Sequence, residues 1–366
     1  MFNRSAARLS YEKALLTSFL FIKSLVVYYF QFPNEFEPVR FIIDLISYAI
    51  FFLLLCQYFT RIKFHRVVFL FILMVFYNIF FQSQQLVLIN ALFTSLLSIL
   101  ISDKKYRNDA VLYAVSLNLA LFSLFVAIGY GLGFTSSVEI RGLNYIASIF
   151  FLGVVFSISR EKVSFYRVFL LFIFIAALIF LKSRTYLLFS IFYILLVLGN
   201  RKVFYFFVIP SLFVFLYYYD ITSLINKWGG SGSDITSGRL DNYIDYLVVM
   251  LERFPYSLFP FSLYSEMLPG VDYLVSFNES GYHAPHNYII STLYDGGFIL
   301  GITWILINFY LLINLALNEY SVFLQALIMF LASMLEPIIG VSTNIYTIIY
   351  FSLLFGGVVG FSNDKI

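Results

Sequence analysis

Long apolar runs separated by short polar segments dominate this chain and predict its secondary structure. An apolar helix of about 20 residues can cross a hydrocarbon core of about 30 Å, and it satisfies its own backbone hydrogen bonds there. The twelve predicted spans are residues 13–30, 41–59, 67–82, 86–101, 111–133, 143–158, 165–181, 185–199, 203–219, 298–317, 321–335 and 344–361, of which the third, fourth, eighth and eleventh are short. The pattern therefore predicts an all-α, polytopic membrane protein with twelve transmembrane helices.

Composition agrees with this class. Of the 366 residues, 61% are hydrophobic, 21% aromatic and 12% charged, whereas soluble domains contain about 25% charged residues. The lone Cys56 lies inside the second predicted span, so neither a disulfide nor a thiolate metal site is expected. The net charge of +3 says little about partners, because the lysines and arginines that flank the spans produce it.

The distribution of lysine and arginine predicts the orientation, since short loops rich in these residues stay in the cytoplasm. One side holds fifteen of them: Arg4, Arg8, Lys13, Arg61, Lys63, Arg66, Lys104, Lys105, Arg107, Arg160, Lys162, Arg167, Arg201, Lys202 and Lys365. The other side holds seven, with Lys23 left inside the first span: Arg40, Arg141, Lys182, Arg184, Lys227, Arg239 and Arg253. Both termini are therefore expected in the cytoplasm, and the first span is expected to be an uncleaved anchor because no small-residue cleavage site follows it.

The chain is expected to form one integral membrane domain with one large outward loop. Residues 1–219 contain nine spans, residues 220–297 form the loop with short helices, and residues 298–366 contain three spans. Within the loop, an amphipathic helix is predicted over residues 242–252. Its apolar side is expected to contain Tyr243, Tyr246, Leu247, Met250 and Leu251, and Pro255 and Pro260 are expected to end it.

A second loop helix should begin at Asn287 and break at Gly296–Gly297, just before the tenth span. Four cations are expected on the same outer face, namely Arg141, Arg184, Arg239 and His286. Histidine titrates near neutrality and suits proton transfer, while the planar guanidinium matches phosphate oxygens. The same residue types also suit a snorkelling interfacial arginine and a histidine that hydrogen-bonds a neighbouring carbonyl.

Carboxylates give two further signals. Asp241 and Asp245 stand four residues apart on the predicted loop helix, a spacing that also fits a solvated surface pair. The loop contains no Asp-x-Asp, which disfavours a divalent-metal diphosphate site. Lys23 and Asp44 fall in the outer halves of adjacent spans and are expected to pair, with a structural or a functional role, because charges buried in a bilayer are costly.

Several of these residues occur together in a known order. Ser183-Arg184-Thr185, Ser237-Gly238-Arg239-Leu240, Pro255, His286-Asn287-Tyr288 and the glycines Gly297 and Gly301 resemble the O-antigen ligase and O-antigen polymerase superfamily over roughly residues 140–305. Where relatives often carry a Gly-x-Gly after the loop proline, this chain has Pro255-Tyr-Ser-Leu-Phe-Pro260. The acceptor side is therefore expected to differ in shape.

The resemblance implies an inverting, metal-independent glycosyltransferase with GT-C-like, polyprenyl-phosphate-dependent architecture and no cofactor. It would act at the periplasmic face of the bacterial inner membrane on glycans linked to undecaprenyl diphosphate. Arg184 and Arg239 would hold the diphosphate, and His286 would deprotonate the acceptor sugar hydroxyl. Arg141 would assist, and Asn287, Tyr288 and Asp241 would contact substrate. The implied partners are the lipid-linked donor and acceptor, membrane lipid and a chain-length regulator protein, with no nucleic acid.

An O-antigen polymerase is favoured within this superfamily, because the chain is compact, rich in Phe, Tyr and Ile, and only loosely matches the ligase pattern. The alternatives are a ligase that transfers glycan to lipid A core and a lipid-linked oligosaccharide flippase. A flippase is expected to show two related halves and charges along several spans, whereas the polar residues here gather outside. A chain-length regulator or scaffold would leave the arginine and histidine set unexplained.

Overall fold

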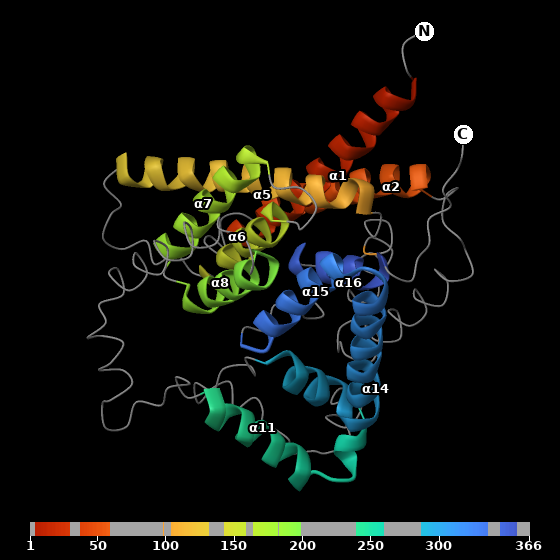
Figure 1. The fold of residues 1–366 in the computed structure, drawn as a ribbon. Coiled ribbons are helices and arrows are strands. Elements are labelled where there is room, and N and C mark those ends of the chain that lie inside the picture. The colour runs from red at the N-terminus through yellow and green to blue at the C-terminus, as the bar shows by residue number, and fades with distance from the viewer. Residues whose placement is uncertain are drawn as a thin grey trace.

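The computed structural model describes residues 4–29, 37–58, 98, 104–131, 143–158, 164–181, 183–198, 239–259, 287–335 and 345–356 (Figure 1). Its helices are α1 (Arg4–Tyr29), α2 (Glu37–Tyr58), α5 (Lys104–Gly131), α6 (Leu143–Ser157), α7 (Phe165–Phe180), α8 (Arg184–Leu198), α11 (Arg239–Glu252), the 3₁₀ helix η2 (Tyr256–Leu258), α14 (Tyr288–Asn318), α15 (Tyr320–Ser333) and α16 (Ile345–Gly356). These ranges contain no strand. The predicted all-α class is confirmed for the described part of the chain.

Nine of the twelve predicted spans coincide with helices of the structure. The other three, residues 67–82, 86–101 and 203–219, lie outside the described residues except for Ser98. Among the described helices, Gly296–Asn318 within α14 is long and apolar enough to cross a membrane by length and composition, and six shorter apolar helices accompany it. The count of twelve membrane-spanning helices stays a prediction.

The centre of the bundle is formed by α6 and α16. All residues from Ile146 to Ile158 and from Ile345 to Phe355 are buried, as expected for helices that are apolar on every side. α6 packs against α5, α7 and α8, while α16 packs against α14 and α15. At Gly153 of α6, a Cβ atom would lie 2.7 Å from the ring of Phe174 in α7, so the absence of a side chain lets these two helices approach closely.

The outer faces of the bundle are apolar as well. Phe165 and Phe169 of α7 are exposed, and so are Leu306, Ile313 and Leu317 in the long second part of α14. Monomeric soluble proteins rarely expose contiguous apolar surfaces larger than a few hundred Å². These faces are therefore suited to contact with hydrocarbon.

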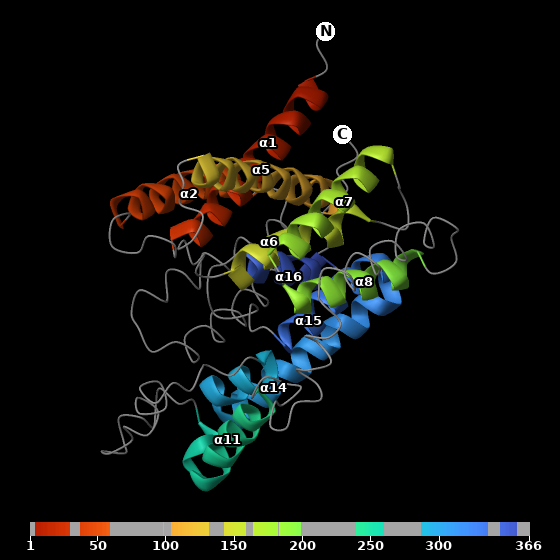
Figure 2. The ribbon, with the colours of Figure 1, turned by 90° about the vertical axis from the view of Figure 1, so that its left-hand side faces the viewer.

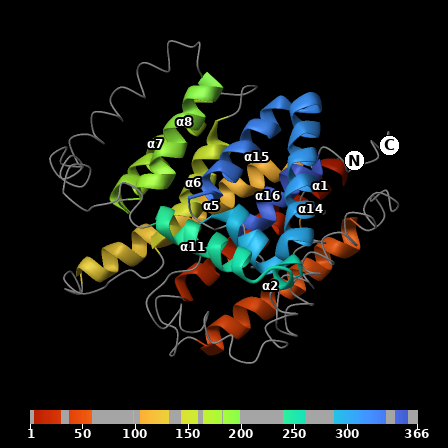
Figure 3. The same cartoon turned by 90° about the horizontal axis from the view of Figure 1, so that it is seen from below.

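The helix α11 forms a layer of its own at one end of the bundle. It lies beside the first part of α14, as Figure 2 and the view from below in Figure 3 both show. The rings of Tyr246 and Tyr294 meet edge to face, with centroids 5.0 Å apart. The predicted loop helix is confirmed, and it begins at Arg239, three residues before the predicted start.

The predicted apolar side of α11 is only partly buried. Tyr246 and Met250 are buried as expected, but Leu247 and Leu251 are exposed and Val249 is buried in their place. The described neighbours cover α11 on the side that faces α14, and the side with Leu247 and Leu251 points away from it. Within the described residues, the apolar surface of α11 is therefore wider than the part that its neighbours cover.

Candidate functional site

The helix α14 begins directly after His286, at a defined cap. Asn287 has an extended backbone (φ −152°, ψ 123°), and its Oδ1 accepts hydrogen bonds from the N–H groups of Ile289 (2.9 Å) and Ile290 (3.2 Å). Asparagine is a preferred N-cap residue because it satisfies helix-end N–H groups in this way. The predicted helix start is confirmed. A substrate contact by Asn287 stays a prediction, and the amide N–H donors are the atoms that the cap does not use.

At Gly297, α14 breaks and its first part folds back against its second. Gly297 has φ 69° and ψ 173°, a region that is essentially restricted to glycine. A Cβ atom there would lie 2.2 Å from the carbonyl oxygen of Phe259, and one at Gly301 would lie 2.8 Å from the Cα of Leu293. The break predicted at Gly296–Gly297 is confirmed. Gly297 permits the turn, and Gly301 permits close contact between the two parts of the helix.

A chain of neutral hydrogen bonds holds the folded-back part in the protein interior. The side chain of Tyr288 is 1% exposed, and its hydroxyl accepts a hydrogen bond of 2.8 Å from Nε1 of Trp304. Asn308 donates to the carbonyl of Trp304 (2.9 Å) and accepts from the hydroxyl of Tyr350 in α16 (3.2 Å). Tyr288 thus anchors the helix start in this structure, and its contact with substrate stays a prediction.

The predicted cations are described only in part. Arg184 is the first residue of α8 and its side chain is exposed. Arg239 is the first residue of α11 and Asp241 follows in the same turn, but their side chains lie outside the described set, as do His286 and Arg141 entirely. α8 packs on α6, α7 and α15, whereas α11 packs on α14. The convergence of Arg184, Arg239 and His286 at one point stays a prediction.

One cation of the outward loop shows a feature that the sequence did not reveal. Arg253 follows α11, and its Nη1 is buried without a hydrogen-bond partner. Ser257 in η2 is 1% exposed, and its Oγ is buried without a partner too. The N–H of Ser257 donates to the carbonyl of Arg253 (3.3 Å), so the two residues lie one turn apart. The one sequence signal for Arg253 was a positive charge on the side where positive charge is disfavoured.

The predicted pair of Lys23 and Asp44 is confirmed. Their Nζ and Oδ1 atoms are 3.2 Å apart, and the side chain of Lys23 is 5% exposed. The ring of Tyr48 lies 5.9 Å from the same Nζ, a weak cation–π contact. Next to this pair, the amide of Asn118 donates to the hydroxyl of Ser24 (2.6 Å). These contacts join α1 to α2 and to α5, which fits a structural role.

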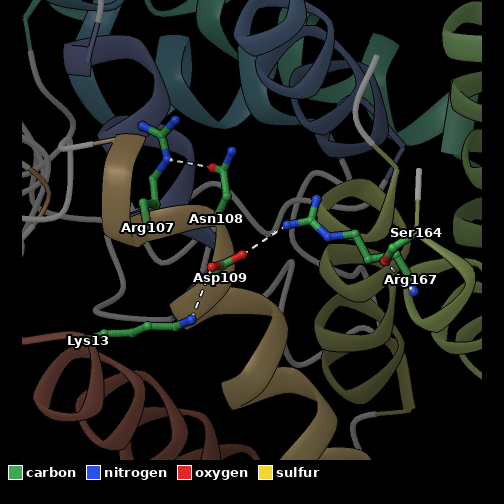
Figure 4. Close-up of polar contacts among 6 residues, drawn as sticks. All are labelled: Lys13, Arg107, Asn108, Asp109, Ser164 and Arg167. Carbon is green, nitrogen blue, oxygen red and sulfur yellow. Dashed lines mark hydrogen bonds and ion pairs between the residues drawn. The ribbon is translucent and has the colours of Figure 1, made fainter. Parts of the chain in front are cut away.

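A second charged cluster, which we call the Asp109 clamp, joins three helices (Figure 4). The carboxylate of Asp109 in α5 pairs with Lys13 of α1 (3.0 Å) and with Arg167 of α7 (2.9 Å). The neighbouring Arg107 is 1% exposed and donates to the carbonyl of Ser352 in α16 (3.1 Å). The carboxylate of Asp109 is paired with two cations from other helices, which fits a role in helix packing, while the Nη2 of Arg107 is buried without a hydrogen-bond partner among the described residues.

The described residues contain no group of three His, Cys, Asp or Glu that could hold a metal ion. Comparison with known protein families, with curated proteins and with solved structures finds no match for this chain. The functional argument therefore depends on the site residues themselves.

Proposed function

We propose that this chain is a multi-pass glycosyltransferase of the bacterial inner membrane that polymerises O-antigen repeat units. It transfers a glycan from undecaprenyl diphosphate to a second lipid-linked repeat unit at the periplasmic face, and both its termini lie in the cytoplasm. Arg184, Arg239 and His286 carry the reaction in this proposal, with Arg141, Asn287, Tyr288 and Asp241 in contact with substrate.

The observation that carries the proposal is the start of α14. The cap at Asn287 and the anchor between Tyr288 and Trp304 fix the backbone that follows His286. The same helix continues through the break at Gly297 into the span-length segment Gly296–Asn318. His286 lies outside the described residues, but it directly precedes this fixed helix start in the sequence, and a general base requires a fixed position.

The Asp109 clamp supports the proposed orientation. The sequence assigned Lys13, Arg107 and Arg167 to the cytoplasmic side from three different loops. In the structure, Lys13 and Arg167 share the carboxylate of Asp109, and Arg107 lies two residues away on the same helix (Figure 4). Residues of one membrane face are expected to lie near one another, so this grouping favours the assigned topology.

The chemistry follows from these residue types. The acceptor hydroxyl attacks the anomeric carbon of the donor from the face opposite the diphosphate, and the bond between that carbon and the diphosphate oxygen breaks. The proton of the hydroxyl goes to the imidazole of His286, and undecaprenyl diphosphate leaves. Negative charge grows on the leaving oxygens, so the guanidinium groups of Arg184 and Arg239 stabilise the transition state more than the ground state.

The test is complementation of a strain that lacks its own copy. His286→Ala removes the general base and is expected to lower the transfer rate by about 10²–10⁴-fold, leaving lipopolysaccharide capped by one repeat unit. Arg239→Ala should give the same banding. His283→Ala is the matched control, because this histidine lies three residues earlier and has no role in the proposal. Full-length ladders from His286→Ala would contradict the proposal.

The lipopolysaccharide banding pattern of these strains also distinguishes a ligase from a polymerase. Loss of a ligase removes even the single-repeat cap, while lipid-linked polymer accumulates in the membrane. Loss of a polymerase keeps the cap and removes the ladder above it.

A further inference from the structure

Arg253 differs from the other cations of the structure. Among the cationic residues whose side chains are described, Lys13, Lys23 and Arg167 pair with carboxylates. Arg107 donates to a carbonyl through Nη1, although its buried Nη2 has no hydrogen-bond partner in the same set, and Arg184 is exposed and has contacts of its own. Arg253 makes no ion pair or side-chain hydrogen bond with any part of the chain that the structure describes, although its Nη1 is buried.

The hydroxyl of Ser257 is also buried without a hydrogen-bond partner in the described ranges. It is enclosed in η2, which packs against α14 near the break at Gly297. A backbone hydrogen bond from the N–H of Ser257 to the carbonyl of Arg253 closes a turn that joins the two residues. A buried donor left without a partner is costly, and more so when it is charged. Two such donors on one turn form a site for an acceptor group.

The surroundings indicate the chemistry of that acceptor. A guanidinium with a neighbouring hydroxyl matches the oxygens of a phosphate. Phe254, Tyr256 and Phe259, which surround the pair along the chain, are exposed, and aromatic side chains of this kind gather at membrane interfaces. The turn also touches Gly297, where α14 enters its span-length segment. The acceptor is therefore anionic and lies at a membrane boundary.

We propose that Arg253 and Ser257 form a phosphate-binding subsite that takes the phosphate group of a membrane lipid. The lipid is either the polyprenyl diphosphate of the proposed reaction, in which case the subsite rests on the proposed function, or an anionic phospholipid of the same leaflet. Arg253 binds the phosphate oxygens through its fork, and the hydroxyl of Ser257 donates one further hydrogen bond.

The test measures lipid binding to the purified full-length protein in detergent by native mass spectrometry. Polyprenyl diphosphate and phosphatidylglycerol are titrated in separate series. Arg253→Gln removes a charge-assisted hydrogen bond and is expected to weaken binding of the cognate lipid by about tenfold or more. Arg253→Lys keeps the charge but loses the planar guanidinium, so its lipid affinity should lie between those of the unsubstituted protein and Arg253→Gln. Ser257→Ala should lower the lipid affinity about threefold. Arg8→Gln, the same substitution at the start of α1, is the matched control.

The two lipid series identify the source. Loss confined to polyprenyl diphosphate assigns the subsite to substrate, and loss confined to phosphatidylglycerol assigns it to a bound membrane lipid. Unchanged affinity for both lipids in folded Arg253→Gln overturns the proposal. If that variant fails to fold, unchanged affinity in both Arg253→Lys and Ser257→Ala overturns it instead. This experiment measures lipid binding and requires no glycan transfer. A protein that is shown not to be a polymerase can therefore still confirm or contradict the phosphate-binding subsite.

Discussion

The Asp109 clamp and the turn at Arg253 hold partly buried cations in different ways. In the clamp, one carboxylate serves Lys13 and Arg167, and three helices are joined through it. In the turn, one buried donor atom of Arg253 and one of Ser257 have no hydrogen-bond partner in the part of the chain that the structure describes. The carboxylate of the clamp is paired within the protein, whereas the two donors of the turn are the atoms that our proposal assigns to a lipid phosphate.

This difference separates structural from functional charge without any homologue. Burying a charge costs free energy unless a partner compensates it, so closed clusters are retained for packing. An open cluster is retained at a cost to stability, and binding is the ordinary reason for such a cost. Substitutions in the clamp and at Lys23 and Asp44 should therefore change stability, while substitutions at Arg253 should change binding.

The largest effect is expected at the backbone that supports the turn. Gly297→Ala forces a residue with a side chain into a glycine-only conformation, and its Cβ atom would collide with the backbone carbonyl of Phe259. We expect the free energy of unfolding to fall by about 3 kcal/mol or more, measured by denaturant unfolding in detergent. Gly296→Ala, at a position with helical backbone, is the control and should cost less. Equal effects of the two substitutions would mean that the fold-back of α14 does not depend on Gly297.

A nearly equal effect is expected at the buried ion pair. Asp44→Ala leaves the ammonium of Lys23, which is 5% exposed, without its carboxylate, and should lower the free energy of unfolding by about 3 kcal/mol. Combining Asp44→Leu with Lys23→Met should recover most of that loss. A double variant that is stable but inactive in glycan transfer would contradict a purely structural role for this pair.

The sequence predicted the elements that depend on local signals. Apolar runs predicted α6 and α16, and the residue types of Asn287 and Gly297 predicted the cap and the break of α14. The free-energy cost of burying a charge led to the predicted pairing of Lys23 with Asp44. Each of these follows from a residue and its near neighbours, or from a strong energetic requirement.

The sequence did not predict features that depend on distant partners. The covered side of α11 is set by contact with α14, so the sequence did not show that Leu247 and Leu251 are exposed while Val249 is buried. The contact of Tyr288 with Trp304 bridges sixteen residues across a break, and no periodicity encodes it. The Nη1 of Arg253 has no hydrogen-bond partner because no acceptor from another described helix lies near it, and the positions of those acceptors are defined only by the folded chain.

A smaller effect is expected at the anchor of α14. Tyr288→Phe keeps the ring and leaves the indole N–H of Trp304 buried without its acceptor, which should cost about 1–2 kcal/mol. Because Tyr288 contacts substrate in the proposed function, the glycan-transfer rate per folded molecule should fall as well. An unchanged transfer rate per folded molecule would contradict that contact and leave Tyr288 as an anchor of the helix start.

The smallest effect is also the most direct test of the comparison, because the same substitution is made in both regions. Arg167→Gln removes a bridge to Asp109, whose side chain is 42% exposed, so solvent screening limits the expected loss of stability to about 1 kcal/mol. Arg253→Gln removes a guanidinium whose buried Nη1 has no described hydrogen-bond partner, so the free energy of unfolding should stay unchanged or rise by about 1 kcal/mol. Thermal unfolding of both variants in lipid-free detergent gives the comparison. An Arg253→Gln loss as large as that of Arg167→Gln would mean that Arg253 is already paired within the protein, and the contrast between closed and open charge would disappear.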